Sequence, residues 1–192
     1  LSLYNNNISD LRPLSNLTDL KKLELPGNEI SDLQPLSKLT KLRRLDVSYN
    51  NITDLNPLKG LNNLKELVLS QTNISDLRPL SNLTNLEELE LNYNVQLDLS
   101  PLKSLPLHSL SLVGTRISNL RPLADFTTLK QLDLGYNNIT DLRPLSNLTD
   151  LEELFLDKNP ISNIQPLADL INLQRLHLSD NKISDLRPLS NL

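Results

Sequence analysis

A repeat of 22 residues is the feature that most limits how this chain can fold. Successive copies begin at a leucine, namely Leu20, Leu42, Leu64, Leu86, Leu107, Leu129, Leu151 and Leu173. A partial copy precedes Leu20, which makes nine copies within residues 1–192, and the fifth copy, Leu86–Pro106, has only 21 residues. A fixed period of this length is typical of a solenoid, in which each unit packs against its neighbours.

Apolar residues recur at positions 1, 4, 6, 11, 14, 17 and 20 of each copy, counted from the leading leucine. Positions 4 and 6 alternate as in a short strand, and the others are spaced like turns around a coil. Leucine fills most of these positions, with 51 leucines in a chain that is 38% hydrophobic and 3% aromatic. Because burying one leucine contributes about 1.5–3 kcal/mol, the copies are expected to stack so that these side chains leave water.

Two polar positions in the repeat predict how each unit turns. Position 9 is Asn in seven copies and Thr in the other two, Thr72 and Thr115. An Asn side chain both donates and accepts hydrogen bonds, so it can satisfy buried backbone groups where a strand enters a loop. Position 16 is Pro in every copy. Proline fixes φ and has no N–H donor, so it is expected at the first position of a short helical turn, and the few residues that follow predict a 3₁₀ turn.

Composition excludes several classes of function. The chain has no Cys, Met or Trp, two His and four Gly, and its net charge is -4. It can therefore hold no thiolate zinc site, disulfide or cysteine nucleophile, and its acidity argues against nucleic acid as a partner. There is no nucleophile elbow, phosphate-binding glycine loop or membrane-spanning apolar run. We expect no enzyme activity, no cofactor, no metal, no catalytic residue and no membrane insertion.

The repeat string L-x-x-L-x-L-x-x-N-x-I-x-D-L-x-P-L-x-x-L-x-x resembles the leucine-rich repeat in its 22-residue form. The element DLRPLSNLTN at 76–85 is similar to the repeats of bacterial internalins, and a related 22-residue form occurs in regulatory subunits of protein phosphatase 1. This resemblance implies an α/β-type solenoid, a right-handed horseshoe with a parallel β-sheet on its concave face and 3₁₀ turns on its convex face. Nine strands spaced about 4.8 Å apart would give a concave sheet roughly 40 Å long.

In such repeats, positions 3, 5, 7, 8 and 10 face outward on the concave surface and its edge. These positions are acidic in the middle copies and basic at both ends, which favours a basic partner surface. They also carry apolar and aromatic side chains that a solvated sheet does not need. The resulting candidate partner-binding residues are Tyr49, Val68, Glu90, Tyr93, Val113, Asp133, Tyr136, Phe155 and His177.

Several of these residues have a simpler interpretation that stays open. Each position-8 tyrosine could merely cover the rim of the core. His177 could ligate a metal with Asp157 or Asp180, but one His beside carboxylates is weak support, and a solvated side chain is favoured. Phe126 occupies a core position and is expected only to pack. Arg recurs at position 15 as a convex stripe, which the Asp residues at position 13 would partly neutralise.

The fifth copy breaks the pattern. Gln96 stands at position 11, where the other copies have Ile, and it is flanked by Val95 and Leu97. A buried glutamine without partners would be costly, so we predict a local shift in which Val95 or Leu97 turns inward. The shift could be a neutral result of repeat evolution or a change of curvature beside Tyr93 and Val113.

The expected function is a protein-protein interaction module that holds a protein partner on its concave face. The resemblance implies a secreted or cell-surface bacterial protein of the internalin type. One alternative is a cytoplasmic regulatory or scaffolding subunit of a phosphatase-like enzyme, and another is a structural spacer with no ligand. Residues 1–192 are expected to form a single domain without capping units, so its uncapped ends could associate end to end or belong to a longer protein.

Overall fold

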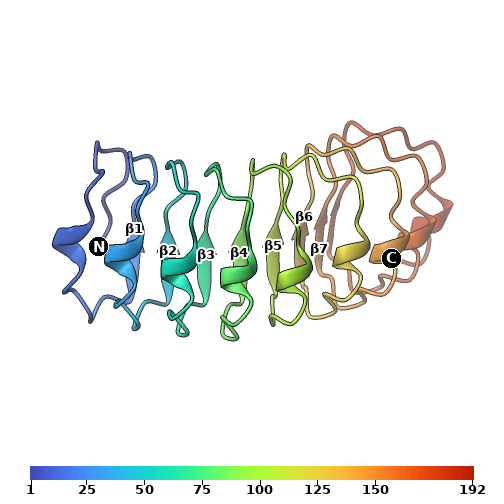
Figure 1. The fold of residues 1–192 in the computed structure, drawn as a ribbon. Coiled ribbons are helices and arrows are strands. Elements are labelled where there is room, and N and C mark those ends of the chain that lie inside the picture. Colours follow the sequence, from blue (N-terminus) through green and yellow to red (C-terminus); the bar gives the residue numbers. More distant parts are fainter.

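Eight short parallel strands form one open sheet in the computed structural model, which describes all 192 residues. Each strand pairs with the next along the chain, so the order in the sheet is the order in the sequence. Figure 1 shows the strands in a row, with the two termini at opposite ends of a curved solenoid. The strands are β1 (Lys22–Glu24), β2 (Arg44–Asp46), β3 (Glu66–Val68), β4 (Glu88–Glu90), β5 (Ser109–Ser111), β6 (Gln131–Asp133), β7 (Glu153–Phe155) and β8 (Arg175–His177).

Each copy has one 3₁₀ turn after its loop, and these turns form a second row along the convex face (Figure 1). The 3₁₀ turn predicted at position 16 is confirmed, but Pro is the second residue of every turn and not the first, because the residue before it already belongs to the turn. The turns are η1 (Arg12–Leu14), η2 (Gln34–Leu36), η3 (Asn56–Leu58), η4 (Arg78–Leu80), η5 (Ser100–Leu102), η6 (Arg121–Leu123), η7 (Arg143–Leu145), η8 (Gln165–Leu167) and η9 (Arg187–Leu189).

The expectation of nine strands is wrong by one. The first copy makes only an isolated bridge, from Ser2 to Glu24, instead of a strand. It begins at position 4 of the repeat and therefore lacks the position-3 residue with which each of the other strands starts. The bridge still continues the row, because the Leu3 N–H donates to the Glu24 carbonyl at 2.8 Å.

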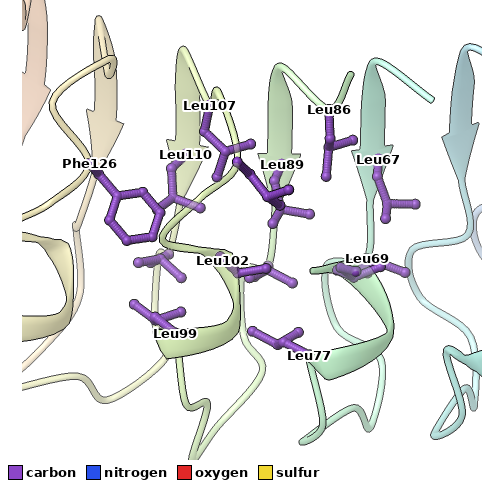
Figure 2. Close-up of a cluster of buried hydrophobic side chains, with 14 of the residues drawn as sticks. Leu67, Leu69, Leu77, Leu86, Leu89, Leu99, Leu102, Leu107, Leu110 and Phe126 are labelled. Carbon is purple, nitrogen blue, oxygen red and sulfur yellow. The ribbon is translucent and has the colours of Figure 1, made fainter. Parts of the chain in front are cut away.

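One continuous hydrophobic core of 47 buried residues lies between the strands and the turns. The middle residue of every strand is a leucine, which points inward because alternate residues of a strand face opposite sides. Figure 2 shows this arrangement, with Leu67, Leu89 and Leu110 reaching in from the strands and Leu102 from a 3₁₀ turn. Phe126 is also buried here, as predicted, with 3% of its surface exposed.

The position-9 asparagines connect each copy to the one before it. The Asn50 amide donates to the carbonyls of Leu25, Val47 and Ser48, and its oxygen accepts from the Ile30 N–H at 2.9 Å. Asn28, Asn137, Asn159 and Asn181 repeat this pattern. The structure therefore confirms that these side chains satisfy buried backbone groups.

The shift predicted in the fifth copy is confirmed. Gln96 is exposed and has a φ of 61°, whereas Leu97 packs against the core and Val95 stays exposed. A cavity of about 260 Å³ lies between the fifth and sixth copies, bordered by Leu97, Leu112 and Ile117 among others. The local shift thus turns a leucine inward and keeps the glutamine in solvent, whereas the residue that this copy lacks is missing further along, after Leu105.

Asp–Arg pairs neutralise most of the convex arginine stripe. Arg12, Arg78, Arg143 and Arg187 each bond the carboxylate of the aspartate two residues earlier, for example Arg78 Nη2 to Asp76 Oδ2 at 2.8 Å. The same aspartates accept the arginine's backbone N–H. In the sixth copy Asn119 takes the place of the aspartate, so Arg121 has no carboxylate at this position.

These pairs predict a loss of stability in acid. The side-chain and backbone hydrogen bonds from arginine lower the pKa of Asp10, Asp76, Asp141 and Asp185 from 3.8 to about 2. A carboxyl whose pKa is lower in the folded state stabilises the fold above its unfolded pKa, and this contribution is lost as the pH falls toward 2. The melting temperature of the wild type should therefore exceed that of Asp76→Asn at pH 6 and approach it near pH 2. A difference that is constant with pH would contradict this.

Candidate protein-binding surface

The position-5 side chains form one straight row across the concave sheet. Strand pairing places Glu24, Asp46, Val68, Glu90, Ser111, Asp133, Phe155 and His177 directly beside one another in that order. Five of the nine candidate residues lie in this row, because each ends a strand at the same register. The position-3 residues form a parallel row two residues earlier on each strand.

Charges on this face are balanced at its ends and unbalanced in its middle. Near the N-terminal end, Glu24 bonds Lys22 Nζ at 2.9 Å and Arg44 Nε at 3.3 Å, and Arg44 also pairs with Glu66. Near the other end, Arg175 pairs with Glu153 at 3.1 Å. In the middle of the face, four carboxylates form no ion pair: Asp46, Glu88, Glu90 and Asp133.

Two of these middle carboxylates have raised pKa values. Partial desolvation on the concave face raises the pKa of Glu90, and the negative charges of Asp46, Glu88 and Asp133 add to this, although Arg44 opposes it. Desolvation also raises the pKa of Asp133, and the Gly135 N–H partly offsets it. Both carboxylates are therefore held where a positive charge would be favourable.

Four of the candidate residues border one hollow of about 230 Å³. Tyr49 and Tyr93 come from copies three and five, and Val68 and Glu90 from the adjacent strands β3 and β4. Val68 is almost fully buried at 6% exposure, so it presents a small apolar surface there. The remaining lining residues are Arg44, Asp46, Ser48, Ser70 and Asn92.

The three candidate tyrosines all stand in the left-handed backbone region. Position 8 has a positive φ in every copy, and it is 54° at Tyr49 and 57° at Tyr93 and Tyr136. Glycine fills this position only twice, and a residue with a Cβ is disfavoured there by about 1–2 kcal/mol. Each tyrosine is nevertheless half-exposed, at 50–53%. Half exposure is expected both of a ring that covers the rim of the core and of a ring that contacts a partner.

Glycine at the next position 8 sets where the Tyr93 ring lies. A Cβ added to Gly114 would come within 2.6 Å of Tyr93 Cδ1 and Cε1, so the ring lies directly against the Gly114 backbone. The Tyr93 N–H also donates to the Val113 carbonyl at 2.8 Å. The ring is thus supported by the sixth copy at one side of the hollow.

A second group of candidate residues lies in the C-terminal half of the same face. The Phe155 and His177 rings meet edge to face with centroids 4.8 Å apart, and Asp133 is the strand neighbour of Phe155 on its other side. Tyr136 is contacted by Lys158, whose Nζ lies 4.5 Å from the ring centroid. The interaction with the Tyr136 side chain raises the pKa of this lysine.

Val113 belongs to neither group, since it lies half-buried between them with its N–H bonded to Asn92 Oδ1. His177 Nδ1 is 3.5 Å from Asp157 Oδ2, and Asp180 is not part of this contact. No set of three or more His, Cys, Asp or Glu residues is arranged to hold a metal ion. The structure also contains no helix with the length and apolar character needed to cross a bilayer.

Sequence reasoning missed Ser70, Asp46 and Lys158 as members of these two groups. Asp46 and Ser70 line the hollow, and Lys158 covers Tyr136. Their positions carried a usable signal: Asp46 and Lys158 occupy the same positions in the repeat as Glu90 and Tyr136. Ser70 stands at position 7, beside a valine where the preceding copy has an aspartate.

Comparison with protein families identifies the repeat. The family model described as leucine-rich repeats in two copies matches residues 20–60, 62–104, 107–147 and 127–169, and a single-repeat model matches residues 170–186. Together these matches cover well over half of the chain. A sequence comparison with curated proteins found no match.

Solved structures similar to the chain include two internalins of Listeria monocytogenes. Internalin InlF has a TM-score of 0.86 and 36% identity over the whole of this chain, which spans 64% of that structure. Internalin C2 has a TM-score of 0.68 and 40% identity, again over the whole chain and 76% of that structure. A leucine-rich repeat protein of Leptospira interrogans has a TM-score of 0.87 and 29% identity, and the chain spans 52% of it.

Proposed function

Because the chain belongs to the leucine-rich repeat family, we propose that residues 1–192 act as one domain that binds a protein partner on the concave face. The observation that carries this proposal is the exposure of three tyrosines in the position-8 row beside the concave sheet. Exposed tyrosines are frequent anchors of protein interfaces. Phe155 and Val68 extend this apolar surface onto the sheet.

The partner surface that we propose is basic. Asp46, Glu88, Glu90 and Asp133 face outward without an ion pair, so a partner with positive charge would gain from meeting them. Burial of the face by a neutral or acidic partner would instead desolvate these carboxylates without compensation. Tyr49, Val68, Tyr93, Val113, Tyr136, Phe155 and His177 would supply the apolar contact.

The proposed role is binding, in an internalin-like protein that is secreted or displayed at the surface of a bacterium. The similarity to two internalins supports this setting over a cytoplasmic phosphatase subunit. Finding the protein only in the cytoplasm of its source cells, by fractionation, would contradict it. No catalytic role is proposed for any residue.

The proposal is tested with two variants of the immobilised chain. Tyr93→Ala with Phe155→Ala alters the concave face, and Arg78→Ala with Arg143→Ala alters the convex face to a similar extent. A protein captured by the wild-type chain should bind the concave variant about thirtyfold more weakly and the convex variant almost unchanged. Surface plasmon resonance measures both affinities. Equal binding by the wild type and the concave variant would contradict the proposal.

End-to-end self-association stays a prediction. The two terminal copies expose apolar side chains, among them Leu1, Leu17 and Leu186. If these faces meet, light scattering of residues 1–192 should show a mass that rises with concentration, and Leu186→Lys should reduce it. A monomer at every concentration would contradict this.

A further inference from the structure

We propose that the hollow between Tyr49 and Tyr93 is a specific site for one lysine or arginine side chain of the partner. This inference rests on the proposed function and deepens it by naming the group that enters the concave face. The hollow of about 230 Å³ combines an apolar floor, two carboxylates and a hydroxyl group with no partner. A basic side chain has a matching apolar stem and charged tip.

The hydroxyl of Ser70 is the most specific feature of this hollow. Its Oγ is the one buried side-chain N or O atom in the structure without a hydrogen-bond partner, and the residue is only 6% exposed. In the preceding copy, the Oγ of Ser48 donates to Asp46 Oδ1 at 2.6 Å. Ser70 has Val68 at the equivalent place, so its hydroxyl has no carboxylate to bond. A buried polar atom without a partner is costly, and a ligand that donates to it would remove that cost.

The charges around the hollow select a cation. The Glu90 carboxylate makes no hydrogen bond or ion pair, and the Asp46 carboxylate uses only its Oδ1, which accepts from the N–H and Oγ of Ser48. Arg44 also borders the hollow, but its guanidinium is already bonded to Glu24 and Glu66. Two carboxylates that border the same hollow as Ser70 thus remain for an ammonium or guanidinium group, which carries several N–H donors.

The apolar residues fit the stem of such a side chain. Val68 supplies the floor, because it is the only apolar residue among the first six members of the position-5 row. Tyr49 and Tyr93 stand two copies apart at the edge of the sheet, and the Tyr93 ring is supported by Gly114. An aromatic ring also attracts a cation placed over its face.

The experiment uses blocked single amino acids as probes, so it needs no identified partner. N-acetyl-lysine methylamide and N-acetyl-arginine methylamide are titrated into ¹⁵N-labelled chain and followed by NMR, with the norleucine analogue as the uncharged control. We expect saturable shifts of the Val68, Ser70 and Glu90 amides with the two basic probes only. Glu90→Gln should weaken this binding about tenfold or more, because it removes a charge-assisted contact.

Glu88→Gln is the matched control, since Glu88 lies on the same strand and is also unpaired but does not border the hollow. This variant should keep the affinity of the basic probes.

Equal binding of norleucine, equal loss of affinity in both variants, or shifts spread over the Asp133 amide as well as the Glu90 amide would overturn the inference. If the partner still depends on Tyr93 and Phe155 while the probes do not bind, only this inference fails. If the probes bind but the variant with Tyr93→Ala and Phe155→Ala captures the protein partner as well as the wild type does, only the proposed function fails.

Discussion

Replacing Asn50 with alanine is expected to lower the free energy of unfolding by about 4 kcal/mol. The change removes four hydrogen bonds of the Asn50 side chain. Two of them join the third copy to the backbone of the second copy, and two lie within the third copy. The carbonyls of Leu25 and Ser48 keep other donors, but the Ile30 N–H and the Val47 carbonyl lose the Asn50 side chain as their partner. Each buried backbone group left without a partner costs about 1–3 kcal/mol.

The two threonine copies provide matched controls for Asn50. The hydroxyl of Thr72 has one proton to donate, either to the Leu69 carbonyl of its own copy at 2.9 Å or to Asn94 Oδ1 at 3.0 Å, and it does not reach back to the preceding copy. Asn50→Thr should therefore cost about half as much as Asn50→Ala, and Thr72→Asn should add about 1 kcal/mol of stability. Urea unfolding followed by circular dichroism measures all three. Equal losses for the alanine and threonine variants of Asn50 would show that the bonds between copies contribute little.

Replacing Phe126 with alanine is expected to destabilise the fold by a similar amount, about 4 kcal/mol. The side chain is 97% buried within the continuous core, where Figure 2 shows its ring pointing toward the leucines of the fifth and sixth copies. Removing the ring would leave a cavity among the leucines of the fifth and sixth copies, whose lining loses its contacts with the ring.

Phe126→Leu is the control, because leucine occupies this position in the other eight copies. It should cost about 1 kcal/mol, since it retains most of the buried apolar volume. The same urea titration distinguishes the two variants. If Phe126→Leu were as damaging as Phe126→Ala, the ring itself and not its volume would be required at this place.

The sequence predicts the fold closely because each repeat position has one physical task. Apolar residues at positions 4 and 6 flank the outward residue that ends each strand, Pro at position 16 lies within each 3₁₀ turn, and Asn at position 9 bonds the preceding copy. These tasks depend on spacing within one copy, which can be read from the sequence. The first copy forms a bridge and not a strand, because it starts at position 4 and lacks the position-3 residue with which the other strands begin.

The candidate surface is harder to predict because it depends on neighbours from different copies. The row from Glu24 to His177 follows from the repeat, and so do the three tyrosines. The grouping of Tyr49, Val68, Glu90 and Tyr93 around one hollow does not, because it spans copies three to five. Ser70 becomes informative only when its missing partner is compared with the Ser48–Asp46 bond of the preceding copy.

The most direct test of concave-face binding is a site-specific photo-crosslink. A benzophenone side chain replaces Gln71, which stands between Tyr49 and Tyr93 in the position-8 row, or Lys59, which follows a turn on the convex face. We predict that a bound protein crosslinks from residue 71 and not from residue 59, and that Tyr49→Ala with Tyr93→Ala abolishes the product. Crosslinking from residue 59 alone, or from residue 71 unaffected by loss of both tyrosines, would contradict binding on the concave face.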